Sequence, residues 1–372
     1  MNIFGKYCTA ILLSFLFTSG IAVTAGSTDS KPVDYQWSAP GFTTDFTRML
    51  IDPDEILSGG PQKDGIPAID NPVYTSIKDA AGWLEGNEPV ILVRVGDKSR
   101  IFPLQILMWH EIINDELDSL PITVTFCPLC NTGIVFNRKF SGKTLNFGTT
   151  GRLRNSNLIM YDRQTESWWQ QATGEAVIGA FSGESLTMIP ALTLSFSEAQ
   201  AAAPTADVIS RNTGYSRPYG QNPYAGYDAP GSKPFLFQGP IDTEHDAMDR
   251  VLVVKHKGEE RIIVYSEVRD KGILQISIAG DPVVLFWAPG ASSALDAGRL
   301  SDGRNVGSLN AFISVVSGKN LDFTKASAGL FMDTETGSTW SGNGKALEGS
   351  LIGSRLTPVT AVQHFWFSAQ AF

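Results

Sequence analysis

The sequence contains a weak internal repeat, which restricts the chain to folds that use one structural unit twice. Three apolar segments, at residues 90–95, 100–101 and 121–128, recur in the second half at a constant offset. Further on, residues 141–187 recur with small shifts as residues 317–357. Self-similarity of this kind is typical of a duplicated structural unit. Side chains kept in both copies are therefore expected to serve the fold, whereas side chains present in one copy are candidates for chemistry.

The clearest difference between the copies is a Cys-x-x-Cys pair. Cys127 and Cys130 of the first copy are replaced by Ala288 and Ala291 in the second. The sequence has one further cysteine, Cys8, in its N-terminal segment. A disulfide between cysteines three residues apart closes a very short loop and stabilises a fold little. We therefore interpret the pair as a functional site rather than a structural crosslink.

The N-terminus has the features of a secretory signal. Lys6 precedes an apolar stretch at residues 10–17, and small residues follow up to Ala25. We expect cleavage near Ala25 and a periplasmic or secreted protein with no integral membrane span, because the apolar stretch is short for a bilayer. The net charge of −9 argues against nucleic acid and anionic membranes as partners, since both attract basic surfaces.

Short β-branched and aromatic segments, separated by glycine and proline, predict a mainly β fold. We expect two divergent tandem units resembling β-barrels or β-sandwiches, with a few short helices. The strongest helical pattern covers residues 104–115, and another helix is predicted at 196–203. The predicted organisation is a signal peptide (1–25), an N-terminal extended arm (26–66), a first β unit (67–203), a Tyr/Pro/Gly-rich ordered loop (204–245) and a second, degenerate β unit (246–372).

The repeat also identifies partners for the two sulfur atoms. His110 and Met160 correspond to Lys271 and Phe331, so the second copy lacks an imidazole and a thioether as well as both thiols. Thiolate, imidazole and thioether ligands together favour copper, especially Cu(I), over harder ions. The predicted site is one copper ion held by Cys127, Cys130, His110 and Met160. If Met160 belongs only to the core, Glu111 or Asp162 would complete a zinc site instead.

Two other functions fit the same residues. A metal-free thiol–disulfide oxidoreductase would use Cys127 and Cys130, although the residues after Cys130 predict a turn and strand rather than the helix that usually activates such a pair. A cell-envelope binding module would instead recognise a protein partner through the degenerate copy and the tyrosine-rich loop. That loop would either pack on the first unit or cover the cysteine site. No nucleotide cofactor is predicted, because the phosphate-binding and dinucleotide-binding motifs are absent from the sequence.

Three motifs resemble the signature of a bacterial family of exported domains of unknown function. They are Trp-His-Glu at residues 109–111, Cys-Pro-Leu-Cys at 127–130 and Asn-Ser-x-Leu-x-Met-Tyr-Asp at 155–162. The resemblance covers most of the chain and implies no particular activity. It implies a motif core that adds five residues to the predicted ligands, where they would orient the ligands or face a substrate: Trp109, Glu111, Asn155, Tyr161 and Asp162. Relatives often have glycine where this chain has Asn131.

Overall fold

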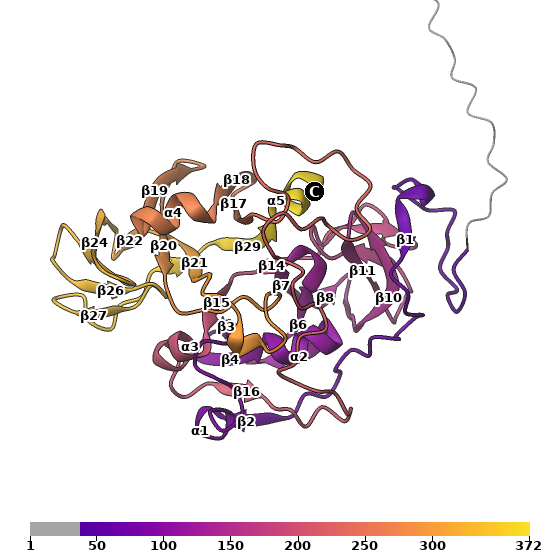
Figure 1. Ribbon diagram of the computed structural model, residues 1–372, viewed down its shortest axis with the longest axis horizontal. Coiled ribbons are helices and arrows are strands. Elements are labelled where there is room, and N and C mark those ends of the chain that lie inside the picture. Colours follow the sequence, from indigo (N-terminus) through magenta and orange to yellow (C-terminus); the bar gives the residue numbers. More distant parts are fainter. Residues whose placement is uncertain (1–37) are drawn as a thin grey trace, which may run out of the picture. The chain divides into compact units, whose positions relative to one another are not determined.

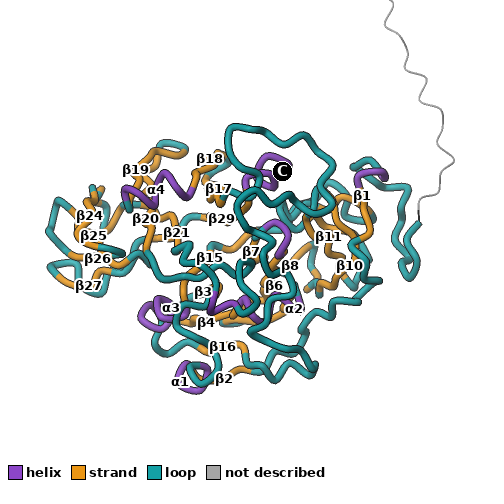
Figure 2. Tube along the Cα trace, viewed as in Figure 1, coloured by secondary structure: helices purple, strands orange, loops and turns teal. Residues whose placement is uncertain are grey.

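The computed structural model describes residues 38–372, so the predicted signal peptide and residues 26–37 of the predicted arm lie outside the described residues. The described part is mainly β with a few short helices, as the sequence predicted (Figures 1 and 2). The helices are α1 (Ile77–Ala80), α2 (Leu104–His110), α3 (Phe196–Ala202), α4 (Tyr265–Lys271) and α5 (Trp366–Ala371), with 3₁₀ turns η1 (Pro53–Glu55), η2 (Pro128–Cys130) and η3 (Leu300–Asp302). Among these described helices, none has the length and apolar character needed to cross a bilayer.

The first half of the chain forms three sheets and a small hairpin. One sheet has the order β1 (Ile56–Ser58), β10 (Phe147–Arg154), β11 (Asn157–Asp162), β12 (Trp168–Gln170) and β13 (Ala176–Ile178). The second has the order β14 (Met188–Ile189), β7 (Thr132–Asn137), β6 (Leu120–Cys127) and β5 (Ile112–Leu117). The third has the order β15 (Ala191–Ser195), β3 (Pro89–Val95), β4 (Lys98–Pro103), β16 (Asp207–Ile209) and β2 (Tyr74–Ser76). The hairpin pairs β8 (Lys139–Phe140) with β9 (Lys143–Thr144).

The second half repeats this topology (Figure 1). Its sheets have the orders β18 (Glu259–Val264), β17 (Arg250–His256) and β29 (Thr360–Phe365), and β19 (Ile273–Ile278), β20 (Asp281–Ala288), β21 (Ser308–Ile313) and β28 (Thr357–Pro358). The last has the order β24 (Phe323–Ser327), β25 (Leu330–Asp333), β26 (Thr339–Ser341) and β27 (Ala346–Glu348), and the hairpin pairs β22 (Val315–Val316) with β23 (Lys319–Asn320). Helix α4 takes the place of α2, and α5 that of α3. The internal repeat is therefore a repeat of structure.

Side chains that both copies keep hold the fold in the same way twice. The indole Nε1 of Trp169 donates to Asp162 at 3.0 Å, and that of Trp340 donates to Asp333 at 2.8 Å. In each copy, a threonine three residues after the aspartate also donates its backbone N–H to that carboxylate. Both aspartates and both tryptophans are fully buried. Asp162 therefore links the turn at Thr165 to the core residue Trp169, because a buried carboxylate needs hydrogen-bond donors and these two residues supply them.

The two copies pack as parts of one compact unit. One core cluster combines Phe102 and Ile122 of the first half with Leu295 and Phe365 of the second. A further cluster likewise joins β-strand and helix residues of the first half to phenylalanines of β20 and β21. Because each copy buries apolar side chains against the other, the second copy supports the cysteine-bearing one.

The predicted helix at residues 104–115 is too long. Helix α2 ends at His110, and Glu111 adopts a left-handed conformation with φ of 57° before β5 begins at Ile112. Nearly every residue of this segment is buried, so the apolar pattern could not distinguish helix from buried strand.

Two other segments hold more strand structure than the sequence predicted. Strand β16 lies inside the predicted loop at 204–245, where it joins β4 and β2. Within the predicted arm, β1 pairs with β10 and extends its sheet. Their short lengths and lack of alternating polarity explain why local pattern did not reveal them.

Candidate functional site

The two cysteines sit on a tight turn between β6 and β7. Cys127 ends β6 and precedes η2, and Cys130 is the last residue of η2. Pro128 supplies the φ angle that starts the turn, and Asn131 closes it with φ of 54°, which asparagine tolerates better than most residues. Both cysteines are free thiols, 2% and 0% exposed. The turn therefore presents two adjacent sulfur atoms inside the protein.

The surroundings of Cys127 keep it protonated. Burial raises the pKa of the Cys127 thiol well above its ordinary value, and its hydrogen bond with Cys130 raises that pKa further. Backbone N–H groups of Leu158 and Cys130 face the sulfur and act in the opposite direction. The thiol lies 3.6 Å from the carbonyl oxygen of Ser156, to which it donates. Thiol chemistry at this position therefore requires a nearby group that takes the proton.

Glu111 lies next to Cys127, and its backbone conformation is unusual. It caps α2 in the left-handed region, where the equivalent cap of α4 is Gly272 with φ of 83°. A glutamate in this region is strained relative to glycine, and such strain concentrates at functional sites. The side chain is 8% exposed. Burial raises the pKa of Glu111 well above its ordinary value, and the neighbouring Cys127 charge raises it further. Burial thus disfavours the charged form of the Glu111 carboxyl group next to Cys127.

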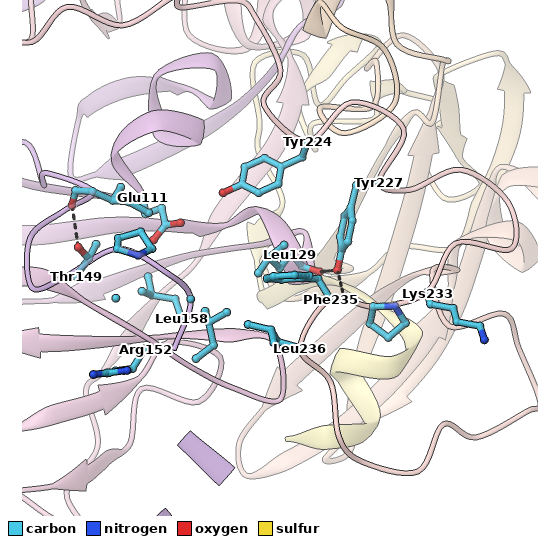
Figure 3. A pocket seen from close by; sticks show the side chains of 16 residues that line it. Glu111, Leu129, Thr149, Arg152, Leu158, Tyr224, Tyr227, Lys233, Phe235 and Leu236 are labelled. Atoms are coloured by element: carbon cyan, nitrogen blue, oxygen red, sulfur yellow. Dashed lines mark hydrogen bonds between the residues drawn. The ribbon is translucent and has the colours of Figure 1, made fainter. Parts of the chain in front are cut away.

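A cavity of about 590 Å³ lies against the cysteine turn (Figure 3). Its walls are mainly apolar and include Ile66, Leu129, Leu153, Leu158, Phe235 and Leu236. Leu129 lies between the two cysteines in sequence, and the N–H group of Leu158 faces the Cys127 sulfur. Glu111 and Tyr224 carry their polar ends on the cavity side, as Figure 3 shows. The arrangement provides an apolar space with a proton-carrying group beside two thiols.

The tyrosine-rich loop covers this cavity. Tyr227 donates its hydroxyl to the carbonyl oxygen of Leu129 at 3.1 Å and accepts the N–H of Phe235 at 3.1 Å (Figure 3). The Ser156 hydroxyl donates to the carbonyl oxygen of Phe235. Burial raises the pKa of Tyr224 and Tyr227, so both remain neutral hydroxyl groups. Of the two roles that the sequence left open for this loop, its contacts with the cysteine turn match the covering role.

His110 is fully engaged elsewhere. Its Nδ1 lies 2.7 Å from the carbonyl oxygen of Pro67, and its Nε2 lies 2.7 Å from the hydroxyl of Tyr219. Because a carbonyl only accepts, Nδ1 carries the proton and Tyr219 donates to Nε2. Burial lowers the pKa of His110. Within residues 38–372, His, Cys, Asp and Glu side chains form no group of three or more that could hold a metal ion. The structure thus brings the two cysteines together and ties His110 to the loop.

Met160 and Tyr161 lie on opposite faces of β11. Met160 is fully buried opposite Trp169, just as Phe331 is buried opposite Trp340 in the second copy. A methionine in this place fills a core position that the fold requires twice. The Tyr161 hydroxyl donates to Asp64 at 2.5 Å, in a separate apolar cluster that includes Trp168.

Asn155 and Trp109 lie outside the cysteine pair's immediate contacts. Asn155 forms the turn between β10 and β11 together with Ser156, and both have positive φ angles. Asparagine is favoured in such hairpin turns. Trp109 is partly buried and packs against the main core cluster.

Sequence reasoning missed a buried polar network that holds the cysteine turn. Asn157 donates to the side-chain oxygen of Gln171 at 2.8 Å, and Gln171 donates to the carbonyl oxygen of Thr132 at 3.1 Å. The Thr132 hydroxyl in turn donates to the carbonyl of the second cysteine. The second copy has Ala328 and Gly342 in place of the amide side chains. The sequence analysis treats residues present in only one copy as candidates for chemistry. Applied to Asn157 and Gln171, this rule would have identified both.

A family model matches residues 63–372, which include both copies, the cysteine turn and the loop over the cavity. No curated protein and no solved structure matches the chain. With most of its length covered by that model, the chain belongs to the family described as "Protein of unknown function (DUF3179)".

Proposed function

We propose that this protein is a thiol–disulfide oxidoreductase in which Cys127 and Cys130 exchange electrons with a substrate disulfide. The observation that carries the proposal is the contact between the two thiols, with the Glu111 carboxyl beside Cys127 at the wall of a cavity. The signal-like sequence of the N-terminus supports a location outside the cytoplasm, where disulfides form and persist.

The reaction proceeds in two balanced steps. First, the Cys127 sulfur attacks a substrate disulfide R–S–S–R′, which forms a Cys127–S–S–R bond and releases R′–SH. Glu111 relays the proton, giving its own to the leaving sulfur while it accepts the proton of Cys127, so no net charge enters the apolar site. Second, the Cys130 sulfur attacks Cys127, which releases R–SH and forms the internal disulfide. The two thiols lose two electrons, and the substrate disulfide gains them.

The test follows the thiol count of the folded protein. In a Cys8→Ser background, the protein is equilibrated with mixtures of reduced and oxidised dithiothreitol at graded ratios. Its free thiols are then alkylated, and mass spectrometry counts the alkyl groups per chain. We expect a reversible change between two free thiols and none. Cys130→Ser should instead accumulate a mixed disulfide at Cys127, because the second step is lost. Two thiols that stay free at every ratio would refute the proposal.

A second candidate function is Cu(I) binding by the same sulfurs. It is favoured by the backbone N–H groups of Leu158 and Cys130, which would stabilise a thiolate at Cys127. Met160 would be a third ligand, whereas His110 would have to leave both of its hydrogen-bond partners. Elemental analysis after exposure to Cu(I), and separately to Zn(II), distinguishes the candidates. One copper per chain, lost in Cys127→Ser, would support this function, and metal-free protein that cycles its disulfide would exclude it.

A further inference from the structure

The burial of the cysteines restricts what can react with them. Both are almost fully buried, and Tyr227 ties the covering loop to the backbone of the cysteine turn at Leu129. A disulfide held in a folded protein would have to displace this loop to reach Cys127. A small molecule can enter the cavity, whose volume of about 590 Å³ lies in the range of small-ligand sites and whose wall includes Leu129, between the two cysteines.

The lining of the cavity is mainly apolar, and its acidic and basic residues are Glu111, Arg152 and Lys233. Leu153 and Leu158 are cross-strand neighbours on the cavity face of the β10–β11 pair. Arg152 pairs with Ile159, which belongs to the apolar cluster on the other face, so side-chain alternation directs the guanidinium away from the cavity. Lys233 lies on the exposed part of the loop. A charged ligand would therefore lose hydration without gaining an opposite charge inside.

We propose that the cavity binds the oxidant of this redox pair, and that this oxidant is a small, uncharged, apolar organic disulfide. The inference rests on the proposed oxidoreductase function and names its substrate class. Leu129 and Leu158 form the wall nearest the sulfurs, so a change in a leucine rotamer opens the path from the cavity to Cys127. Glu111 supplies the proton for the leaving sulfur, and the Tyr224 hydroxyl offers that sulfur a hydrogen bond from the loop side.

The experiment compares two chromogenic disulfides with the reduced, folded, full-length protein in a Cys8→Ser background. Dithiodipyridine is uncharged at neutral pH, whereas dithiobis(nitrobenzoate) carries two negative charges. Each rate is divided by the rate of the same reagent with dithiothreitol, which removes the difference in intrinsic reactivity. We expect the normalised rate to be about 100-fold higher for the uncharged reagent, because the dianion is excluded from an apolar cavity.

A variant that narrows the cavity tests the location. Leu153→Phe should slow the reaction with dithiodipyridine at least about tenfold while leaving both thiols titratable after unfolding, since an added ring occupies the ligand's space. The matched control is Leu347→Phe at an exposed position of the second copy, which should change nothing. If Leu153→Phe fails to fold, Leu236→Phe on the loop side of the cavity replaces it.

The outcomes separate this inference from the function on which it rests. Equal normalised rates for the two reagents, or faster oxidation by the disulfides of folded insulin, would overturn the substrate class while the internal disulfide still forms. Failure to form that disulfide with any of the three oxidants would instead overturn the oxidoreductase function.

Discussion

At the residue scale, Glu111 shows how the two copies differ in side-chain chemistry while keeping one backbone conformation. Both copies end the same helix with a left-handed residue, and only the first places a carboxyl group there. Gly272 meets the conformational requirement without strain. Glu111 adopts this left-handed conformation with strain and also buries a carboxyl group. Both features cost stability, so a position that served only the fold would favour glycine.

Glu111→Gln should stabilise the protein increasingly as pH rises. The folded-state pKa of Glu111 lies above the ordinary value of 4.5, so its favourable contribution is complete below about pH 4.5 and is lost as pH rises. The difference in unfolding free energy between the variant and the wild type should therefore grow by up to about 1.4 kcal/mol per pH unit above that value. Urea unfolding between pH 5 and 8, extrapolated linearly to zero urea, measures this difference in unfolding free energy. Glu116→Gln, at the one exposed position of β5, is the control, and a difference independent of pH would contradict this assignment.

At the element scale, the same turn closes the β12–β13 hairpin in one copy and β26–β27 in the other. Each turn places a glycine against a core phenylalanine. A Cβ added at Gly174 would lie 2.7 Å from Phe136, and one at Gly344 would lie 2.7 Å from Phe312. Both copies thus keep a glycine where the turn backbone touches the phenylalanine ring, because neither position has room for a side chain.

Gly174→Ala should destabilise the fold more than Gly142→Ala. Both glycines have similar positive φ angles, of 75° and 73°, so both changes cost about 1 kcal/mol in backbone conformation. Only Gly174→Ala also overpacks the core, which adds about 1–3 kcal/mol. Chemical unfolding measures the loss of unfolding free energy in each variant, and the difference between the two losses is the cost of overpacking. Gly344→Ala should lose as much unfolding free energy as Gly174→Ala. Equal losses at Gly174 and Gly142 would show that Phe136 moves aside freely.

Tyr227→Phe should loosen the covering loop and expose the cysteines. The change removes the hydrogen bonds that Tyr227 makes with Leu129 and Phe235, while the ring that packs near Phe365 remains. Two bonds of about 1 kcal/mol each correspond to about a tenfold or greater rise in the open population. The rate of cysteine alkylation by N-ethylmaleimide in the folded protein measures this rise. Tyr215→Phe, at an exposed position of the same loop, should leave the rate unchanged.

At the scale of the whole molecule, the second copy supports the cysteine-bearing one. Its last strand carries His364, whose Nδ1 lies 3.2 Å from the hydroxyl of Thr132, two residues after Cys130. Nδ1 also lies 3.1 Å from the hydroxyl of Ser368 on α5. The second copy thus contacts the strand that leaves the cysteine turn and helps to fix its position.

His364 should make stability fall in acid. Burial lowers the pKa of His364 to about 3, below the ordinary value of 6.5. The unfolded chain therefore binds a proton that the folded chain excludes, so the stability from His364 is complete above about pH 6.5 and is lost as pH falls toward 3. His364→Gln should flatten the decline in urea midpoint between pH 6.5 and 4 relative to His245→Gln, a histidine near the surface. Parallel declines in the two variants would rule out this role.

The sequence by itself determined the doubled β architecture and the position of the cysteine turn between two strands. It did so because local alternation, turn residues and the differences between the copies are all properties of neighbouring residues. Only the tertiary structure decided that α2 stops at His110, that this imidazole bonds Pro67 and Tyr219, and that Glu111 meets Cys127 beside a cavity. These outcomes depend on contacts between residues far apart in the chain. A fully apolar segment or a lone histidine carries no local sign of which distant partner it will meet.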